Sequence, residues 1–144
     1  MSVTDDECRV LSWLAEGRDV LEIGTGLGVS TRALASSYNR LCTVDPDPWV
    51  AEHVVPALRE FDVWHEAEIP EEWDRREFDL VFIDGDHSEE AVLADLRRTL
   101  PLLRRGGLVV LHDTNLDGVR RAAESFGTLV RMDTNGHLGM LLVG

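Results

Sequence analysis

Short apolar runs alternate with amphipathic stretches along most of this chain. Two of the runs, FDLVFI at 78–83 and LVVLH at 108–112, each contain four successive apolar residues and predict strands that are buried on both faces. Strands of this kind, separated by helices, are typical of a parallel sheet with helices packed on both sides. We therefore expect one α/β domain over residues 1–144.

The remaining elements are predicted from apolar periodicity and from turn and capping residues. Further strands are expected at Val20–Ile23, Leu41–Val44, Val63–Glu66, Thr128–Met132 and Leu138–Val143. Helices are expected at Asp5–Glu16, Val29–Ser37, Trp49–Phe61, Ser88–Arg104 and Val119–Phe126. Together they predict a doubly wound, mostly parallel seven-stranded sheet of Rossmann-like type with a C-terminal antiparallel hairpin. Ligands are expected at the carboxyl ends of the strands.

Charge and cysteine content argue against several classes of protein. The net charge is −13 and every basic residue is an arginine, with no basic stripe for a nucleic-acid backbone. Cys8 and Cys42 are too few for a disulfide framework or a cysteine metal centre, and they indicate a reducing, cytoplasmic environment. No apolar stretch is long enough to span a membrane, and the first ten residues do not resemble a signal peptide.

A glycine-rich loop, Gly24 to Gly28, follows the first strand, and Asp45 follows the second, 21 residues after Gly24. An acid at this position can accept hydrogen bonds from both ribose hydroxyls. The G-x-G-x-G spacing is one residue shorter than a dinucleotide fingerprint, and Glu22 adds a charge that disfavours a pyrophosphate. A cofactor with a cationic amino-acid end, such as S-adenosylmethionine, fits these residues better.

Four motifs in order, VLEIGTGLGVST, VDPD, FDLVFIDGDH and LRRGGLVVLHD, resemble those of class I S-adenosylmethionine-dependent methyltransferases. FIDGDH followed by LHDT resembles, more narrowly, the small-molecule O-methyltransferases of the catechol and caffeoyl-CoA type and their bacterial antibiotic-pathway relatives. The resemblance extends from about residue 19 to residue 144. It implies an enzyme that transfers a methyl group from S-adenosylmethionine to an oxygen of a small-molecule acceptor.

The resemblance also implies individual roles in cofactor binding. The glycines and Ser30 hold the methionine end, Asp45 binds the ribose, and Ala67 and Glu68 border the adenine. A solvated loop acid is an equal alternative for Glu68. The full expected set is Glu22, Gly24, Thr25, Gly26, Gly28, Ser30, Asp45, Ala67, Glu68 and Asp84.

Metal-dependent members of the family bind a divalent cation through an acid after the fourth strand and an Asp-Asn pair after the fifth. Asp84 and Asp113 match this pattern, whereas Thr114 replaces the amide, with Asn115 or Asp86 as substitutes. A Mg²⁺ site is therefore an open expectation. The alternative is that Asp84 only orients the cofactor ammonium and Asp113 only caps a loop.

Three residues are candidates for catalysis: His87, Asp84 and His112. His87 occupies the position of the family's catalytic lysine and is expected to accept the proton of the acceptor hydroxyl. His112 is expected to lie one strand over, and a structural role is an equal alternative for it.

Other functions remain open from the sequence. They are a nicotinamide oxidoreductase, a cofactor-binding module or partner subunit without its own catalysis, and a methyltransferase acting on protein or RNA. Few residues lie outside the motifs, so no substrate lid is evident, and a large acceptor or a second copy of the chain is expected to close the site. Trp13 and Leu14 either form such a homo-oligomeric interface or cover the sheet.

Overall fold

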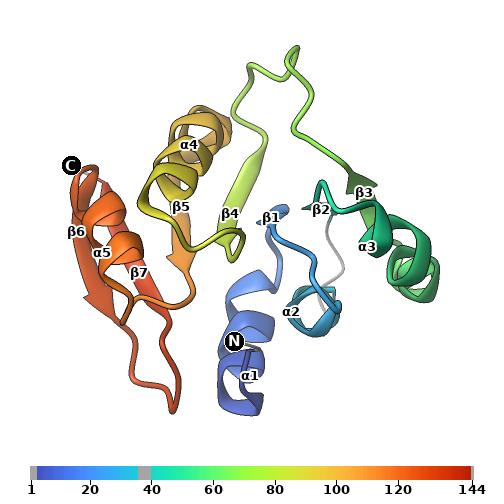
Figure 1. Ribbon diagram of the computed structural model, residues 1–144, viewed down its shortest axis with the longest axis horizontal. Coiled ribbons are helices and arrows are strands. Elements are labelled where there is room, and N and C mark those ends of the chain that lie inside the picture. Colours follow the sequence, from blue (N-terminus) through green and yellow to red (C-terminus); the bar gives the residue numbers. More distant parts are fainter. Residues whose placement is uncertain (1–2, 36–39, 144) are drawn as a thin grey trace.

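Seven strands form one sheet in the computed structural model, which describes residues 3–35 and 40–143 (Figure 1). The strand order is β3-β2-β1-β4-β5-β7-β6. Strands β1 to β5 are parallel, and β7 lies antiparallel between β5 and β6. This confirms the predicted doubly wound sheet with its antiparallel C-terminal hairpin. The strands are β1 Val20–Ile23, β2 Leu41–Val44, β3 Trp64–Glu66, β4 Phe78–Ile83, β5 Leu103–Leu111, β6 Gly127–Arg131 and β7 Gly139–Val143.

Helices cover both faces of the sheet because side chains of the buried strands alternate between two cores. In β4, Val81 and Ile83 pack toward α4 (Glu89–Thr99) and α5 (Asp117–Glu124). Leu80 and Phe82 of the same strand pack in the core that contains α1 and α2. Helices on this second side are α1 Asp5–Ala15, α2 Val29–Leu34 and α3 Pro48–His53 (Figure 1). None of the helices in the described residues is long and apolar enough to cross a membrane.

The helix predicted over Trp49–Phe61 is divided in two. An α-helix ends at His53, and a 3₁₀ helix, η1, follows from Val55 to Phe61. Pro56 explains the change, because it has no N–H to donate and its ring clashes with the carbonyl four residues earlier. The Ala57 N–H instead bonds the Val54 carbonyl three residues back, at 3.0 Å.

The predicted helix Ser88–Arg104 is too long, and the strand after it is correspondingly too short. Helix α4 ends at Thr99, and a 3₁₀ turn, η2 (Leu100–Leu102), contains Pro101. β5 then begins at Leu103, which pairs with Phe78 before a register shift. Gly106 adopts φ +78° in this irregular stretch, a left-handed conformation that glycine accepts without strain. Gly106 therefore lies in an irregular part of β5, in the stretch where the predicted helix was expected to end.

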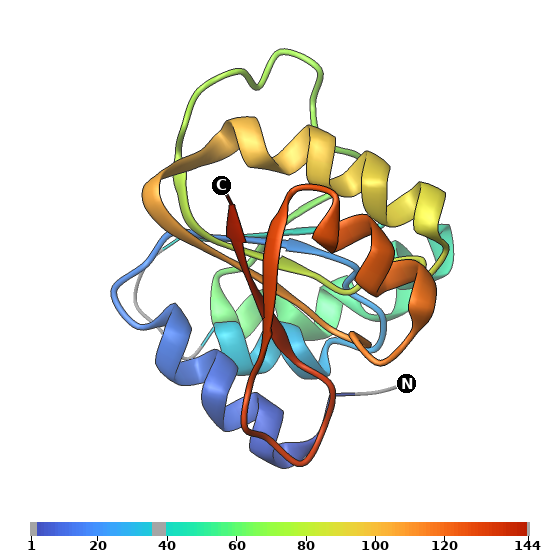
Figure 2. The ribbon, with the colours of Figure 1, turned by 90° about the vertical axis from the view of Figure 1, so that its left-hand side faces the viewer.

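The last elements differ from their predicted bounds by a few residues. α5 begins at Asp117 and ends at Glu124, and β6 begins at Gly127. The end of the predicted helix 29–37, residues 36 and 37, lies outside the described residues. Figure 2 shows the loop between β6 and β7 beside the N-terminal part of α1. There the Asn135 N–H donates to the Asp6 carboxylate at 2.9 Å.

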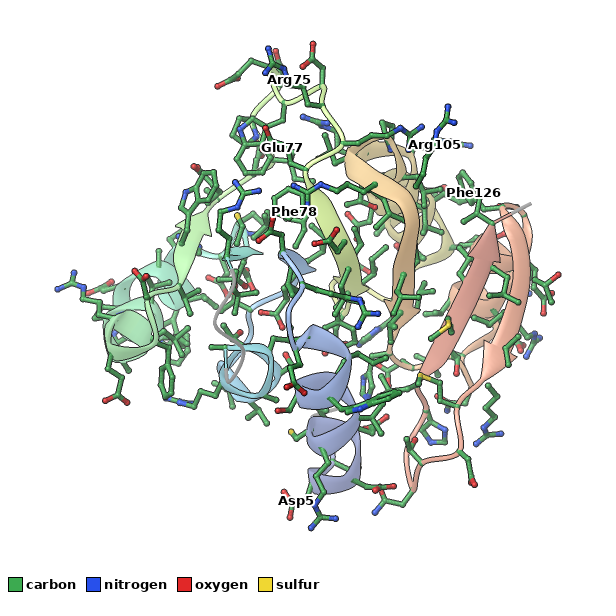
Figure 3. All side chains as sticks on the ribbon, turned by 180° about the vertical axis from the view of Figure 1, so that it is seen from behind. Asp5, Arg75, Glu77, Phe78, Arg105 and Phe126 are labelled. Carbon is green, nitrogen blue, oxygen red and sulfur yellow. The ribbon has the colours of Figure 1, made fainter. Side chains whose placement is uncertain are left out.

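The loop between β3 and β4 extends beyond the sheet, with Arg75 far from the sheet and Phe78 within it (Figure 3). Trp73 anchors this loop by packing edge-on against Trp64, with ring centroids 4.9 Å apart. Arg98 of α4 donates to the backbone carbonyls of Trp73 and Pro70. The loop is thus fixed against α4, where its first residues form one wall of a cleft at the carboxyl ends of the strands.

Candidate active site

The glycine-rich loop lies directly against the carboxyl end of β4. Gly24 has φ +96°, and a Cβ at this position would lie 2.1 Å from the Asp84 carbonyl oxygen. The backbone N–H groups of Thr25 and Gly26 both donate to Asp45 Oδ2 at 3.0 Å. Gly28, at φ +83°, begins α2. The loop is therefore fixed between the ends of β1, β2 and β4, and only glycine fits its closest approach.

Two connected hollows open at this edge of the sheet. The larger has a volume of about 920 Å³ and lies among the loops after β1, β2, β3 and β4 and the side of α4. The smaller, of about 250 Å³, is lined by Ser30 and His87 among others. Gly24, Gly26 and Asp84 line both. A ligand bound along the loop would extend from one hollow into the other.

The larger hollow carries a strong negative charge. Its lining includes one guanidinium, that of Arg98, which is bonded to the carbonyls of the β3–β4 loop. Ala67 and Glu68, predicted near the adenine, are exposed and line this hollow. Its carboxylates are those of Asp45, Asp47, Glu68, Asp84, Asp86 and Asp95.

Glu22, which the sequence places at the cofactor, has a wholly buried side chain. Three hydroxyls donate to it: Ser30 at 2.6 Å, Thr31 at 2.5 Å and Thr43 at 2.8 Å. Burial raises the pKa of Glu22 to about 7 despite these donors. Thr25 is buried as well and shares a 2.6 Å hydrogen bond with Thr43. The carboxyl of Glu22 therefore supports the glycine loop and α2 from beneath.

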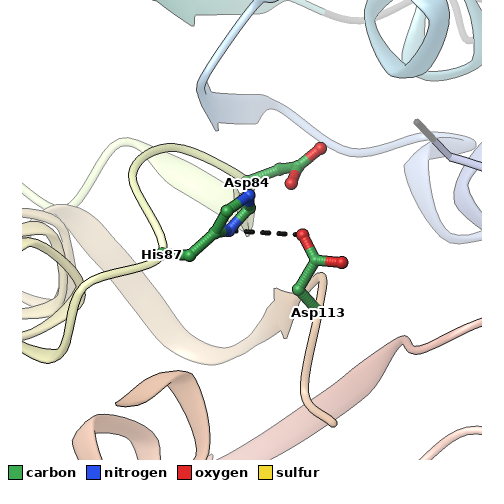
Figure 4. Close-up of side chains that lie close together, drawn as sticks. All are labelled: Asp84, His87 and Asp113. Carbon is green, nitrogen blue, oxygen red and sulfur yellow. Dashed lines mark ion pairs between the residues drawn. The ribbon is translucent and has the colours of Figure 1, made fainter. Parts of the chain in front are cut away.

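Asp84 and His87, which line the smaller hollow, lie close to Asp113 (Figure 4). One ligand atom from each lies within 4.8 Å of the others. His87 Nδ1 is 3.3 Å from Asp113 Oδ2, and the His87 side chain is 42% exposed whereas that of Asp113 is 1% exposed. The structure thus brings together three side chains that the sequence assigned to neighbouring loops.

Asp113 is the unusual member of this cluster. Neither of its buried carboxylate oxygens has a hydrogen-bond partner among the described residues, and its backbone adopts φ +56°, which is rare outside glycine. Burial raises the pKa of the neighbouring Asp84 above its usual value, although His112 lowers it. Unsatisfied carboxylate oxygens next to an imidazole are a donor set that suits a divalent cation. The residues therefore fit a metal ion, with His87 as third ligand.

His112 lies behind the cluster and is almost completely buried. Its Nε2 is 3.1 Å from Glu7 Oε1, and its Nδ1 is 3.3 Å from Asp84 Oδ1 and 3.1 Å from Asp113 Oδ2. Burial lowers the pKa of His112, but the surrounding carboxylates overcome this and raise it to about 9. This arrangement favours the structural alternative for His112, which holds Asp84 and Asp113 in place as a cation.

The expected third metal ligand is engaged elsewhere. Thr114 is buried, and its hydroxyl donates to the His137 carbonyl at 3.0 Å. Asn115 is exposed, and exposed Asp86 accepts the Ser88 N–H at 2.8 Å. The structure groups His87 with the two aspartates in their place.

Two residues near the site were not singled out from the sequence. Glu7 of α1 is wholly buried, receives the Thr4 N–H as part of a capping box, and contacts His112. Only the capping role has a local signal, T-x-x-E. Asp95 lines the larger hollow from α4, and its position on the inner side of an amphipathic helix was the one available signal.

Comparison with known proteins identifies the family. The family described as "Methyltransferase domain" matches residues 21–114, which include the glycine loop, Asp45, Asp84 and Asp113. The chain belongs to this methyltransferase-domain family. Residues 3–20 and 115–143, outside the matched range, supply Glu7 and the C-terminal hairpin to the same domain.

Relatives of this methyltransferase-domain protein point in the same direction. A protein of Mycobacterium sp. (strain JLS) that bears an O-methyltransferase name is 32% identical in an alignment of 123 positions that covers 76% of this chain and 54% of the relative. The chain thus spans about half the length of the named relatives it matches.

Solved structures resemble the whole domain. Cofactor-bound Rv0187 from MTB is 26% identical with a TM-score of 0.74, over 98% of this chain and 81% of that one. An O-methyltransferase from Bacillus cereus in complex with SAH has a TM-score of 0.76 at 20% identity, over 99% of this chain and 83% of that one. The second likeness is one of fold.

Proposed function

We propose that this methyltransferase-domain protein transfers the methyl group of S-adenosylmethionine to an oxygen atom of a small-molecule acceptor. The observation that carries the proposal is the cleft along the glycine loop, whose six carboxylates face a single, already bonded arginine. S-adenosylmethionine carries a sulfonium and an ammonium, whereas a dinucleotide brings a pyrophosphate that this cleft would repel. The Bacillus cereus O-methyltransferase, which shares this fold and is in complex with SAH, supports the same choice.

In this proposal the cofactor lies along the loop, with its adenosine in the larger hollow and its methionine end toward Ser30 and Asp84. The acceptor enters beside His87, where the smaller hollow is open to solvent. Asp45 is oriented by two loop amides and by the Asp47 N–H, which leaves its outer lone pairs for the ribose hydroxyls. Methyl transfer then depends chiefly on alignment, because the sulfonium is already activated.

The reaction is an in-line displacement at the methyl carbon. The acceptor oxygen forms the new O–CH₃ bond as the S–CH₃ bond breaks, and the sulfonium becomes the thioether of S-adenosylhomocysteine. The acceptor proton passes to the His87 imidazole, whose Nδ1 faces Asp113 and whose Nε2 is the accepting atom. Asp113 would then stabilise the resulting imidazolium.

A divalent cation would be held by Asp84, Asp113 and the His87 imidazole, and it would supply Lewis acidity that lowers the pKa of a bound acceptor hydroxyl. With a nitrogen ligand in the set, Mn²⁺ or Zn²⁺ suits these residues better than Mg²⁺. If a cation were bound there, the His87 imidazole would be one of its ligands and would not accept the acceptor proton. That proton would then pass to solvent. A chelator distinguishes the two modes, because only the metal-dependent one is lost.

The acceptor class is proposed from charge and from the names of the relatives. A net charge of −13 disfavours RNA as the acceptor. A small molecule would leave the site open to solvent unless a second copy of the chain covers it. Trp13 is 70% exposed, whereas its neighbour Leu14 is buried, so Trp13 is available for a contact with a second copy.

Calorimetric titration with S-adenosylmethionine, S-adenosylhomocysteine and NAD tests the cofactor, with and without Mg²⁺ or Mn²⁺. We expect micromolar binding of the first two, about −8 kcal/mol, and none of NAD. The His87→Ala variant should bind equally well and lose turnover once an acceptor has been found by screening phenols and catechols. Binding of NAD alone would contradict the proposal, and binding without turnover on any acceptor would favour a cofactor-binding module.

A further inference from the structure

The larger hollow is lined by an acid that has no role in the proposed methyl transfer. Asp95 lies near the middle of α4, is half-buried, and lines the hollow beside Ala91 and Ala94. Its Oδ2 is close to Gly85, since a Cβ on that glycine would lie 3.4 Å away. The carboxylate is thus directed toward the backbone that follows β4, at the inner side of the hollow.

The other acids of the hollow are engaged or exposed. Asp45 binds the glycine loop, Asp47 caps α3, Asp86 caps the turn before α4, and Asp84 faces His112. Glu68 is exposed to solvent. Among residues 3–35 and 40–143, the Asp95 carboxylate makes no hydrogen bond or ion pair, and the Thr99 hydroxyl donates to the Asp95 backbone carbonyl instead.

Arg98, one turn along α4, does not neutralise Asp95. Its guanidinium donates to the carbonyls of Pro70 and Trp73 and so fixes the loop after β3. Ile69 of that loop and the two alanines of α4 give the hollow small and apolar walls. A flat ring suits such walls, and a single unpaired acceptor at its edge suits one amine of that ring.

The position of the hollow indicates which part of the cofactor it receives. Ser30 and His87 line only the smaller hollow, whereas Asp95 and Glu68 line only the larger one. If methyl transfer takes place beside His87, the sulfonium lies near Gly24 and Asp84, which the two hollows share. The nucleoside must then extend past Asp45 toward α4.

We infer that Asp95 is a specificity-determining residue that accepts a hydrogen bond from the exocyclic amine of the adenine ring. This inference rests on the proposed function. The amine carries two N–H donors, and the carboxylate offers only acceptors. A ring with a carbonyl in place of the amine would face Asp95 with two acceptors opposed, so the site would reject it.

The test compares S-adenosylhomocysteine with its deaminated analogue, S-inosylhomocysteine, by calorimetric titration of the purified chain. The wild type should bind the adenine compound at least about tenfold more tightly. Asp95→Asn presents an N–H₂ group to the carbonyl, so it should bring the two affinities to within about threefold or reverse their order. Glu90→Gln, which removes an exposed acid of the same helix, should keep the wild-type ratio.

Asp95→Ser serves as a second variant, because its shorter side chain does not reach the ring edge and should also lower the ratio. Thermal unfolding of each variant checks that it is folded. If the wild type binds S-adenosylhomocysteine and folded Asp95 variants discriminate as before, the inference is wrong and the proposed function stands. If the wild type does not bind S-adenosylhomocysteine, the proposed function fails and this inference fails with it.

Discussion

Two buried carboxyl groups at the same edge of the sheet differ in their hydrogen-bond partners. Glu22, on β1, is fully enclosed and receives three hydroxyl donors at 2.5–2.8 Å. Asp113, in the loop after β5, is as deeply buried, yet neither of its carboxylate oxygens has a hydrogen-bond partner in the part of the chain that the structure describes. Its near neighbours are two imidazoles, at 3.1 and 3.3 Å.

The difference indicates what each acid is for. A buried carboxyl that is saturated by local donors stabilises the surrounding backbone and has no capacity left for a ligand. A buried carboxylate whose only near partners are imidazoles retains lone pairs for a ligand, at a cost in stability. We therefore propose a structural role for Glu22 and a ligand-binding or catalytic role for Asp113.

The largest expected effect is that of Asp113→Asn on catalysis. If Asp113 polarises His87 or holds a metal ion, turnover should fall by about a hundredfold or more. The free energy of unfolding should change by only about 1 kcal/mol, because His112 keeps Glu7 and Asp84 as partners. Steady-state kinetics and urea denaturation measure the two quantities. Wild-type turnover in this variant would make Asp113 a loop-capping residue.

Glu22→Ala, unlike Asp113→Asn, should lower the stability of the fold strongly. It leaves three buried hydroxyls without their acceptor and opens a cavity beneath the glycine loop, which should lower the free energy of unfolding by about 2–4 kcal/mol. Urea denaturation gives the value directly. Glu16→Ala, at an exposed acid just after α1, is the control and should unfold like the wild type. An equal free energy of unfolding for Glu22→Ala and Glu16→Ala would contradict a structural role for Glu22.

The pH dependence of stability isolates the Glu22 charge. Its pKa rises from 4.5 to about 7 on folding, so the folded state holds the proton more tightly than the unfolded state. Stability should therefore fall as the pH rises from about 4.5 to 7 and level off above that, by an amount on the order of 3 kcal/mol. Denaturation of the wild type and Glu22→Gln at several pH values measures this. Parallel curves for the two proteins would show that Glu22 ionises normally.

Asp45→Ala should have the smallest effect, on cofactor affinity. It removes the expected ribose acceptor and also the acceptor of two loop amides, so S-adenosylhomocysteine should bind about tenfold more weakly. Calorimetry measures the affinity, with Glu52→Ala as a matched control at an exposed acid of α3 outside the cleft. Equal affinity of Asp45→Ala and wild type would contradict the ribose assignment.

The meeting of Asp84 and Asp113 was predictable from the sequence. Each follows a strand with successive apolar residues, and β4 and β5 are parallel neighbours with Ile83 opposite Leu111. In a doubly wound sheet such strand ends share one edge. The proposed role of His87 comes from the family resemblance, in which it occupies the position of the catalytic lysine in the same short loop as Asp84.

The arrangement behind that edge was not predictable. Glu7 and His112 are 105 residues apart, and no local pattern relates them. The sequence shows the distance of Glu22 from the glycine loop, but it does not show the three hydroxyls that surround its carboxyl group. The bounds of α3, α4 and β5 also differed, because Pro56 and Pro101 act on hydrogen bonds that apolar periodicity does not report.

The sequence by itself determined the sheet, its order of elements and the glycine loop, because apolar period, glycine spacing and strand-end polarity are local properties of the chain. Only the tertiary structure decided which acids are saturated and which are open. Whether a buried carboxylate finds a donor depends on residues that arrive from other strands and helices. In this protein Ser30, Thr31 and Thr43 donate hydrogen bonds to Glu22, whereas among the described residues Asp113 has only the His87 and His112 imidazoles beside Oδ2 and no hydrogen bond.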